Sequence, residues 1–88
     1  MRDAFRLRIL SPEGVTFDGE AVQISLTGSG GSLSVRAGHI PLVTATKAGV
    51  CRVWTPDSDT VSEFDCGDGI LSVSNDAVTL VCDFVSEK

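Results

Sequence analysis

The sequence predicts an all-β fold, a sandwich or barrel of short strands with no substantial helix, and three observations predict it. Strand-favouring residues are abundant, because the 88-residue chain contains 11 valines, 7 threonines and 4 isoleucines. Apolar and polar residues alternate in many short segments, which is the period of a half-buried strand. Turn-forming residues interrupt these segments at intervals of about eight to twelve residues, a spacing typical of sandwiches and barrels.

Three strands are expected before the first glycine-rich segment. Residues 5–9 alternate apolar side chains with arginine, as a half-buried strand does. Residues 15–17 form a short strand that we expect Asp18 and Gly19 to end. Residues 22–27 alternate aliphatic side chains with small polar ones, the pattern of a third strand.

Glycine marks two turns in the middle of the chain. The segment 27–32, Thr-Gly-Ser-Gly-Gly-Ser, is expected to form a loop, and residues 33–35 resume the strand pattern. A second turn is expected over residues 36–41. Gly31 in the first turn and Gly38 in the second supply backbone conformations that a Cβ atom disfavours. The first turn lacks the Lys-Ser/Thr pair of a phosphate-binding loop, so we expect no nucleotide site in it.

The second half of the chain is predicted to be strands joined by short turns. The expected strands cover residues 42–46, 50–54, 61–66, 70–74 and 77–85. In the last of these, Val78, Leu80, Cys82 and Phe84 recur at every second position. We therefore expect all four side chains to lie on one face and to enter the core.

Length and charge limit the possible classes of function. A chain of 88 residues is expected to form a single domain over residues 1–88. Its net charge of −5 disfavours nucleic acids and anionic membrane surfaces as partners, because both attract basic proteins. The sequence has no apolar run of the roughly 18 residues that a membrane span needs and no signal-peptide pattern. We therefore expect a cytosolic location.

The residues capable of chemistry do not form a recognisable catalytic or metal-binding pattern. Cys51, Cys66 and Cys82 are widely spaced, so we expect them to be small apolar core residues, with a redox role as the alternative. His39 is the only histidine and has no orienting acid near it in the sequence. We expect no bound metal, no cofactor and no catalytic activity of the isolated chain.

A more specific pattern covers residues 26–49. It contains a Thr-Gly-x-x-Gly-x-Leu turn at 27–33, then Gly-His-Ile-Pro-Leu at 38–42, then Lys-Ala-Gly at 47–49. In this order, the three motifs resemble the epsilon subunit family of F-type ATP synthases, called delta in mitochondria. The flanking segments 7–19 and 69–73 agree with the opening strands and the Gly-Ile-Leu-x-Val strand of that family.

The resemblance implies a fold and a function. The fold is a flattened antiparallel β-sandwich of about ten short strands. The function is that of a central-stalk subunit that binds the gamma subunit and the c-ring and couples ion-driven rotation to ATP synthesis. Such a subunit has no catalytic residue of its own and lies at the cytoplasmic face of the inner (plasma) membrane, as a peripheral part of the complex. Neither nucleic acid nor direct lipid binding is expected.

The resemblance also implies contact residues. Positions that face the gamma subunit in the family correspond to Ser11, His39, Leu42 and Thr44. Positions that face the c-ring correspond to Gly28, Ser29, Gly30, Gly31, Ser32 and the nearby Arg36. Family members often carry acidic residues where this sequence has Gly30 and Ser32. An acidic contact from this turn to the c-ring is therefore not expected, and Arg36 is instead a candidate for meeting an acidic partner.

The sequence stops at Lys88, where family members usually continue into two C-terminal helices. A naturally short form would lack the inhibitory helices and would couple rotation without sensing ATP or restraining hydrolysis; a truncated chain is the alternative. Two other functions stay open. One is a generic β-sandwich module that binds a protein through its loops or an edge strand. The other is a small hydrolase centred on His39.

Overall fold

The computed structural model describes residues 4–38, 40–57, 60–75 and 77–88 and contains ten strands and no helix within them. The strands are β1 (Phe5–Ser11), β2 (Gly14–Ala21), β3 (Gln23–Gly28), β4 (Gly31–Arg36), β5 (Leu42–Thr46), β6 (Gly49–Trp54), β7 (Val61–Cys66), β8 (Gly69–Ser74), β9 (Ala77–Cys82) and β10 (Val85–Glu87). The predicted all-β fold is confirmed. The described part of the chain contains no helix whose length and hydropathy would let it cross a membrane.

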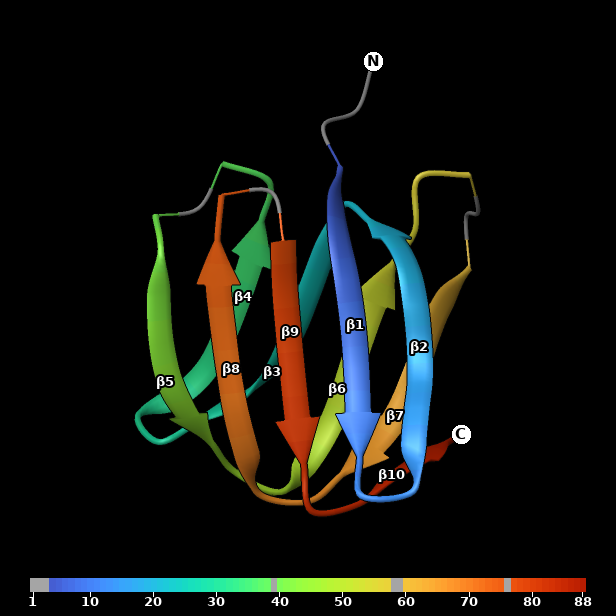
Figure 1. Ribbon diagram of the computed structural model, residues 1–88, viewed down its shortest axis with the longest axis vertical. Coiled ribbons are helices and arrows are strands. Elements are labelled where there is room, and N and C mark those ends of the chain that lie inside the picture. Colours follow the sequence, from blue (N-terminus) through green and yellow to red (C-terminus); the bar gives the residue numbers. More distant parts are fainter. Residues whose placement is uncertain (1–3, 39, 58–59, 76) are drawn as a thin grey trace.

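The strands form two facing layers (Figure 1). The front layer has the order β5-β8-β9-β1-β2, and the back layer has the order β4-β3-β6-β7-β10. At one side the layers are joined where Gly28 of β3 pairs with Thr46 of β5. At the other side β10 lies near β1 and β2, so the sheet nearly closes on itself. The predicted sandwich is therefore confirmed.

One strand pair departs from the expected antiparallel arrangement. β1 and β9 run parallel, with Leu7 opposite Val78 and Ile9 opposite Leu80, whereas the other strand pairs are antiparallel. Parallel neighbours need a long connection, and here almost the whole chain lies between the two strands. The N-terminal strand is thereby fixed inside the front layer, between β9 and the edge strand β2.

The core consists of the side chains that alternate inward from both layers. In β1, Phe5, Leu7 and Ile9 are buried while the arginines between them are exposed, as the sequence predicts. The buried apolar residues are Phe5, Leu7, Ile9, Ala21, Ile24, Leu26, Val35, Cys51, Val53, Phe64, Cys66, Leu71, Val73, Val78, Leu80 and Cys82. Phe17 and Phe64 join the two layers by an edge-to-face contact, with ring centroids 6.1 Å apart.

Two predicted strand ends in the first half of the chain are wrong. Asp18 and Gly19 do not end a strand, because β2 continues through them to Ala21, paired along its length with β1. The predicted loop at 27–32 is mostly strand, since Gly28 pairs with Gly31 and only two residues lie between β3 and β4. Turn-forming residues were outweighed in both places by the backbone pairing that a neighbouring strand provides.

The prediction for the last strand is also wrong. β9 ends at Cys82, and Phe84 is 51% exposed instead of lying in the core. The amide of Asp83 donates to the carbonyl of Asp68, and the amide of Gly67 donates to the carbonyl of Phe84. These bonds turn the chain from the front layer to the back, where β10 pairs with β7. The alternation therefore stops two residues before Phe84.

The three cysteines are free and buried, as predicted, and they come from both layers. Hydrogen bonding with Cys51, together with burial, raises the pKa of the Cys66 thiol to about 12. Hydrogen bonding with Cys66 and burial also raise the pKa of Cys82 above its ordinary value. A thiol that keeps its proton is a poor nucleophile, so the folded chain holds Cys66 and Cys82 in their unreactive form.

We expect this burial to make the stability of the fold sensitive to alkaline pH. The folded chain retains the Cys66 proton up to a pKa of about 12, whereas the unfolded chain releases it near pH 9.0, the ordinary pKa of a cysteine thiol. The free energy of unfolding should therefore be highest below pH 9 and fall as the pH rises from about 9 towards 12. Denaturant titrations across this range measure the fall, and Cys66→Ala should make it shallower. Rapid labelling of all three thiols in the folded chain at pH 8 would contradict the account.

Candidate interaction surfaces

The outer face of the front layer carries a row of apolar side chains, one from each strand. In the register of the sheet, Ala45 pairs with Ile70, Ile70 with Val81, Val81 with Leu10 and Leu10 with Val15. Four of these residues are direct neighbours of buried residues in their strands, so their own side chains point outward. We call Leu10, Val15, Ala45, Ile70 and Val81 the apolar row.

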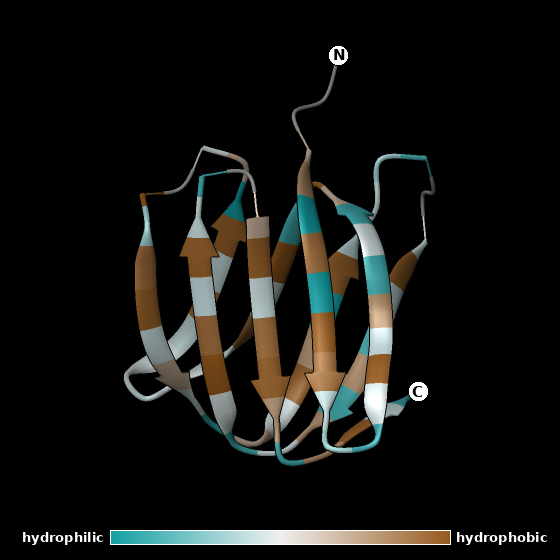
Figure 2. Cartoon of the chain, in the orientation of Figure 1, coloured by the Kyte–Doolittle hydropathy of each residue, from teal (hydrophilic) through white to brown (hydrophobic). Residues whose placement is uncertain are grey.

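Most of the exposed large hydrophobic side chains among the described residues lie on this face. Six large hydrophobic side chains are exposed among the described residues, and four of them lie here: Val15 (51%), Val43 (73%), Ile70 (55%) and Val81 (49%). Figure 2 shows apolar bands on each of the five front strands. Single exposed apolar residues are ordinary, but a contiguous group on one sheet face typically marks a protein interface.

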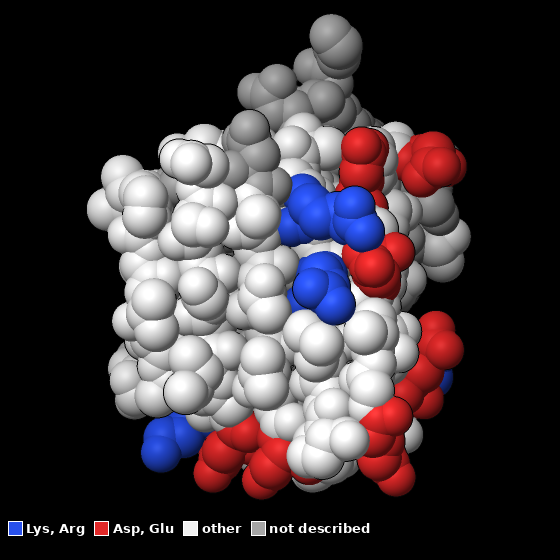
Figure 3. All heavy atoms as spheres, viewed as in Figure 1, with Lys and Arg blue, Asp and Glu red and all other residues white. Residues whose placement is uncertain are grey.

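The charged groups of this face gather over β1 and β2, whereas β5, β8 and β9 carry none. In Figure 3, uncharged atoms fill the left and centre, Lys and Arg lie to the right of centre and along the lower edge, and Asp and Glu line the right and lower margins. Arg6 and Asp18 form an ion pair on β1 and β2, with 2.6 Å between Nη2 and Oδ1. Apolar side chains with charged groups at their margin are the usual composition of a protein interface.

A second surface is formed by the β3–β4 hairpin and the neighbouring edge of β5. Ser29 and Gly30 form the exposed tip, and Gly31 has a φ of +123°, which an L side chain rarely adopts. A hollow of about 330 Å³ lies beside the tip, lined by the hairpin from Gly28 to Leu33 and by Leu42 and Thr44 of β5. The tip carries no charge, so it can contact a partner only through its backbone, its hydroxyl groups and its shape.

The structure brings some of the predicted contact residues together. Leu42 and Thr44, which the resemblance assigns to the gamma subunit, line the same hollow as the hairpin residues that it assigns to the c-ring. Ser11 lies elsewhere, at the end of β1, where its hydroxyl accepts a hydrogen bond from the amide of Glu13. Strands β8 and β9 separate β1 from β5, so Ser11 is about 14 Å from that edge. His39 lies outside the described residues.

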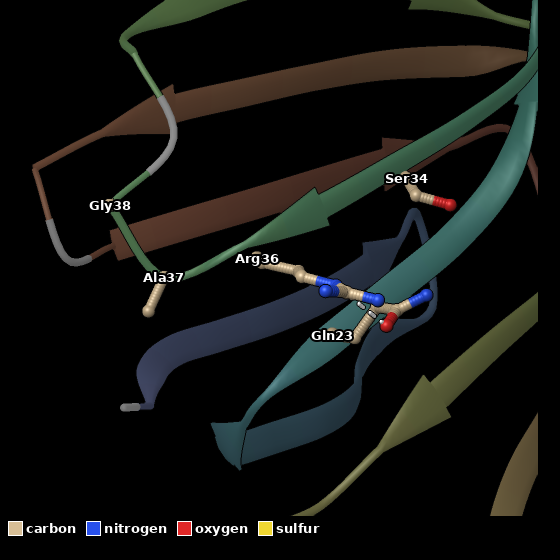
Figure 4. Close-up of a pocket in the computed structure, with 5 residues that line it drawn as sticks. All are labelled: Gln23, Ser34, Arg36, Ala37 and Gly38. Carbon is tan, nitrogen blue, oxygen red and sulfur yellow. Dashed lines mark hydrogen bonds between the residues drawn. The ribbon is translucent and has the colours of Figure 1, made fainter. Parts of the chain in front are cut away.

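Arg36 also lies away from the hairpin tip. It ends β4 and the tip precedes the start of that strand, so the six residues of β4 separate them by about 17 Å. The Arg36 guanidinium donates from Nε to Oε1 of Gln23 across the outer face of the back layer, at 3.0 Å (Figure 4). Together with Ser34, Ala37 and Gly38, these residues line an open hollow of about 430 Å³.

Sequence reasoning missed the apolar row, although the sequence contains a signal for it. Strict alternation puts a polar residue after each core residue, but four front strands contain an apolar pair instead. The pairs are Ile9-Leu10, Leu42-Val43, Ile70-Leu71 and Leu80-Val81. One member of each pair must face outward, because successive side chains point to opposite sides of a strand.

Among the described residues, no three His, Cys, Asp or Glu side chains are arranged to hold a metal ion.

Comparison with known proteins gives a consistent result. The family model for the β-sandwich domain of the ATP synthase delta/epsilon chain matches residues 4–88. The chain is 35% identical over 75 residues to the ATP synthase epsilon chains of a Nostoc species and of Trichormus variabilis, covering 85% of this chain and 55% of each relative. It therefore spans about half the length of the curated relatives that it matches.

Two solved structures share the fold at low sequence identity. One contains the OSCP, F1 and c-ring of the Euglena gracilis mitochondrial ATP synthase; a chain in it matches with a TM-score of 0.87 at 16% identity, over 99% of this chain and 56% of that one. The other shows the central stalk and c-ring of the Tetrahymena thermophila mitochondrial ATP synthase. Its TM-score is 0.77 at 16% identity, over 96% of this chain and 66% of that one.

Measurements of the free energy of unfolding can test which side chains of β8 point outward and which point into the core. Ile70 points outward and Leu71 is fully buried, so neighbouring residues of similar size should respond differently to truncation. We expect Ile70→Ser to change the free energy of unfolding by less than about 0.5 kcal/mol. Leu71→Ala should lower it by about 2–5 kcal/mol, because it leaves a cavity in the core. Equal losses for the two variants, measured by urea titration, would show that the outer face is covered.

Proposed function

The chain belongs to the ATP synthase delta/epsilon chain family, and from that premise we propose that it is the epsilon-type subunit of the central stalk of an F-type ATP synthase. In this role it links the gamma subunit to the c-ring and transmits ion-driven rotation to ATP synthesis. The observation that carries the proposal is the apolar row, an exposed surface that the fold does not use for its own stability.

The gamma subunit is the proposed occupant of the front face. The molecule measures 34 × 26 × 22 Å, and Figure 1 is viewed along its shortest axis, so the front face is the broad one. Its dimensions match the roughly 800 Å² that each partner contributes to a stable protein interface. Leu42 and Thr44 alternate on β5 with the exposed Val43 and Ala45, and Ser11 directly follows Leu10. These predicted gamma contacts are therefore neighbours of the front face along the chain, but their side chains point to the other side of their strands.

The β3–β4 hairpin is the proposed contact to the c-ring. It projects at the lower left of Figure 1, past the edge strand β5, where Gly28 pairs with Thr46 next to Ala45 of the row. Its tip, Ser29 and Gly30, is the part that we propose for a partner other than gamma. A rigid sandwich that holds both partners transmits torque between them, because neither can rotate without the other.

This role is mechanical, and we propose that the chain supplies no catalytic group to the complex. We also propose that it lies at the cytoplasmic face of the inner (plasma) membrane as a peripheral component. Its net charge of −5 opposes direct contact with anionic lipid headgroups, so it is held there by protein contacts.

We expect Ile70→Asp to weaken binding of the purified gamma subunit at least about tenfold, because a charge placed in an apolar contact loses its hydration without gaining a partner. Ser34→Asp is the matched control: it adds the same charge to the exposed outer face of the back layer and should leave the affinity unchanged. Isothermal titration calorimetry measures both, with the fold of each variant checked by circular dichroism.

A hairpin variant separates the two contacts. Ser29→Trp enlarges the tip and should leave the gamma affinity unchanged while reducing co-sedimentation of the chain with gamma and c-ring assemblies.

If Ile70→Asp bound gamma as tightly as the unmodified chain, the row would not be the gamma contact. The chain would then be a β-sandwich module that uses another surface.

A further inference from the structure

Arg8 differs from the other arginines that the structure describes. Arg6 pairs with Asp18, Arg36 donates to Gln23, and Arg52 pairs with Glu63 at 2.8 Å. Arg8 is exposed and makes no ion pair or side-chain hydrogen bond with any described residue. A guanidinium carries five donors, and none of those of Arg8 is accepted by a residue that the structure describes.

The position of Arg8 is next to the apolar row. It lies on the outer face of β1, two residues before Leu10, so their side chains are about 7 Å apart on the same side of the strand. In the register of the sheet it stands opposite Thr79 of β9 and Asp18 of β2. Asp18 is the nearest acid by register, but its Oδ1 accepts from both Nε and Nη2 of Arg6.

A partner that covers Leu10 and Val81 must also reach Arg8, because one side-chain spacing separates them. Covering an unpaired guanidinium removes water from a charge, which is costly unless the partner provides an acceptor. A carboxylate is the acceptor that fits best, since it meets the guanidinium fork with two parallel hydrogen bonds. A second copy of this chain is a poor partner here, because both copies carry a net charge of −5.

We propose that the partner of the front face presents an aspartate or glutamate that pairs with Arg8, and that this ion pair sets the register of docking on the apolar row. The proposal rests on the proposed function, in which that partner is the gamma subunit. The row then supplies an apolar contact that many surfaces could satisfy, while the ion pair selects the surface that carries an acid at the matching position.

The test compares substitutions at Arg8 with one on the opposite layer, using purified gamma subunit as the probe. We expect Arg8→Gln to weaken binding about tenfold and Arg8→Glu about a hundredfold at low salt. Both effects should shrink at about 0.5 M salt, where charges are screened beyond a few ångströms. Arg52→Gln also removes an arginine from an outer face, but from the back layer, and it should leave binding unchanged.

The identity of the acid is established by charge reversal. Among single Asp→Lys and Glu→Lys variants of gamma, one should restore binding to the Arg8→Glu chain and weaken binding to the unmodified chain. Unchanged affinity of Arg8→Glu would overturn the ion pair. Ile70→Asp in the same titration then tests the proposed function. Weaker gamma binding by Ile70→Asp would support the gamma contact without the ion pair. Unchanged gamma binding by Ile70→Asp would contradict both the gamma contact and the ion pair.

Discussion

Successive side chains of a β-strand point to opposite faces, and both the core and the proposed binding surface of this chain depend on that constraint. A strand with one apolar face fills a core and presents its polar side chains to solvent. In the front layer, pairs such as Ile70-Leu71 and Leu80-Val81 send one apolar side chain into the core and the next one out to solvent. The same short strand therefore contributes to folding with one residue and to recognition with its neighbour.

The two layers divide these tasks. The outer face of the back layer carries small polar side chains, the ion pair between Arg52 and Glu63, and three partly buried apolar side chains, Val50, Trp54 and Val61. The front layer leaves its apolar row uncovered, and an exposed apolar surface of this kind marks a site of protein interaction. The β3–β4 hairpin adds a separate contact at the edge of the sandwich. A sandwich with this division is suited to connect two partners, which is the role that the family membership and the row together support.

Much of the fold could be predicted from the sequence because it depends on local patterns. The strands at 42–46 and 61–66 have the predicted bounds, and the cysteines are buried as expected. The predictions of strand ends failed where contacts with segments distant in the sequence determine the backbone conformation. Pairing with β1 carries β2 through Asp18 and Gly19, and hydrogen bonds to Gly67 and Asp68 turn Phe84 out of the core. The parallel pairing of β1 with β9 joins the two ends of the chain, and no local pattern encodes it.

The candidate site was less predictable for the same reason. The resemblance indicated Leu42, Thr44 and the hairpin, which the structure does place around one hollow, but Arg36 and Ser11 lie elsewhere. The row becomes visible only when the register aligns five strands. That the gamma subunit covers the apolar face of the front layer is tested most directly by nuclear magnetic resonance, through cross-saturation from protonated gamma subunit to the methyl groups of the labelled chain. The account predicts transfer to Val43, Ile70 and Val81. Transfer instead to Val50 and Val61, on the outer face of the back layer, would contradict it.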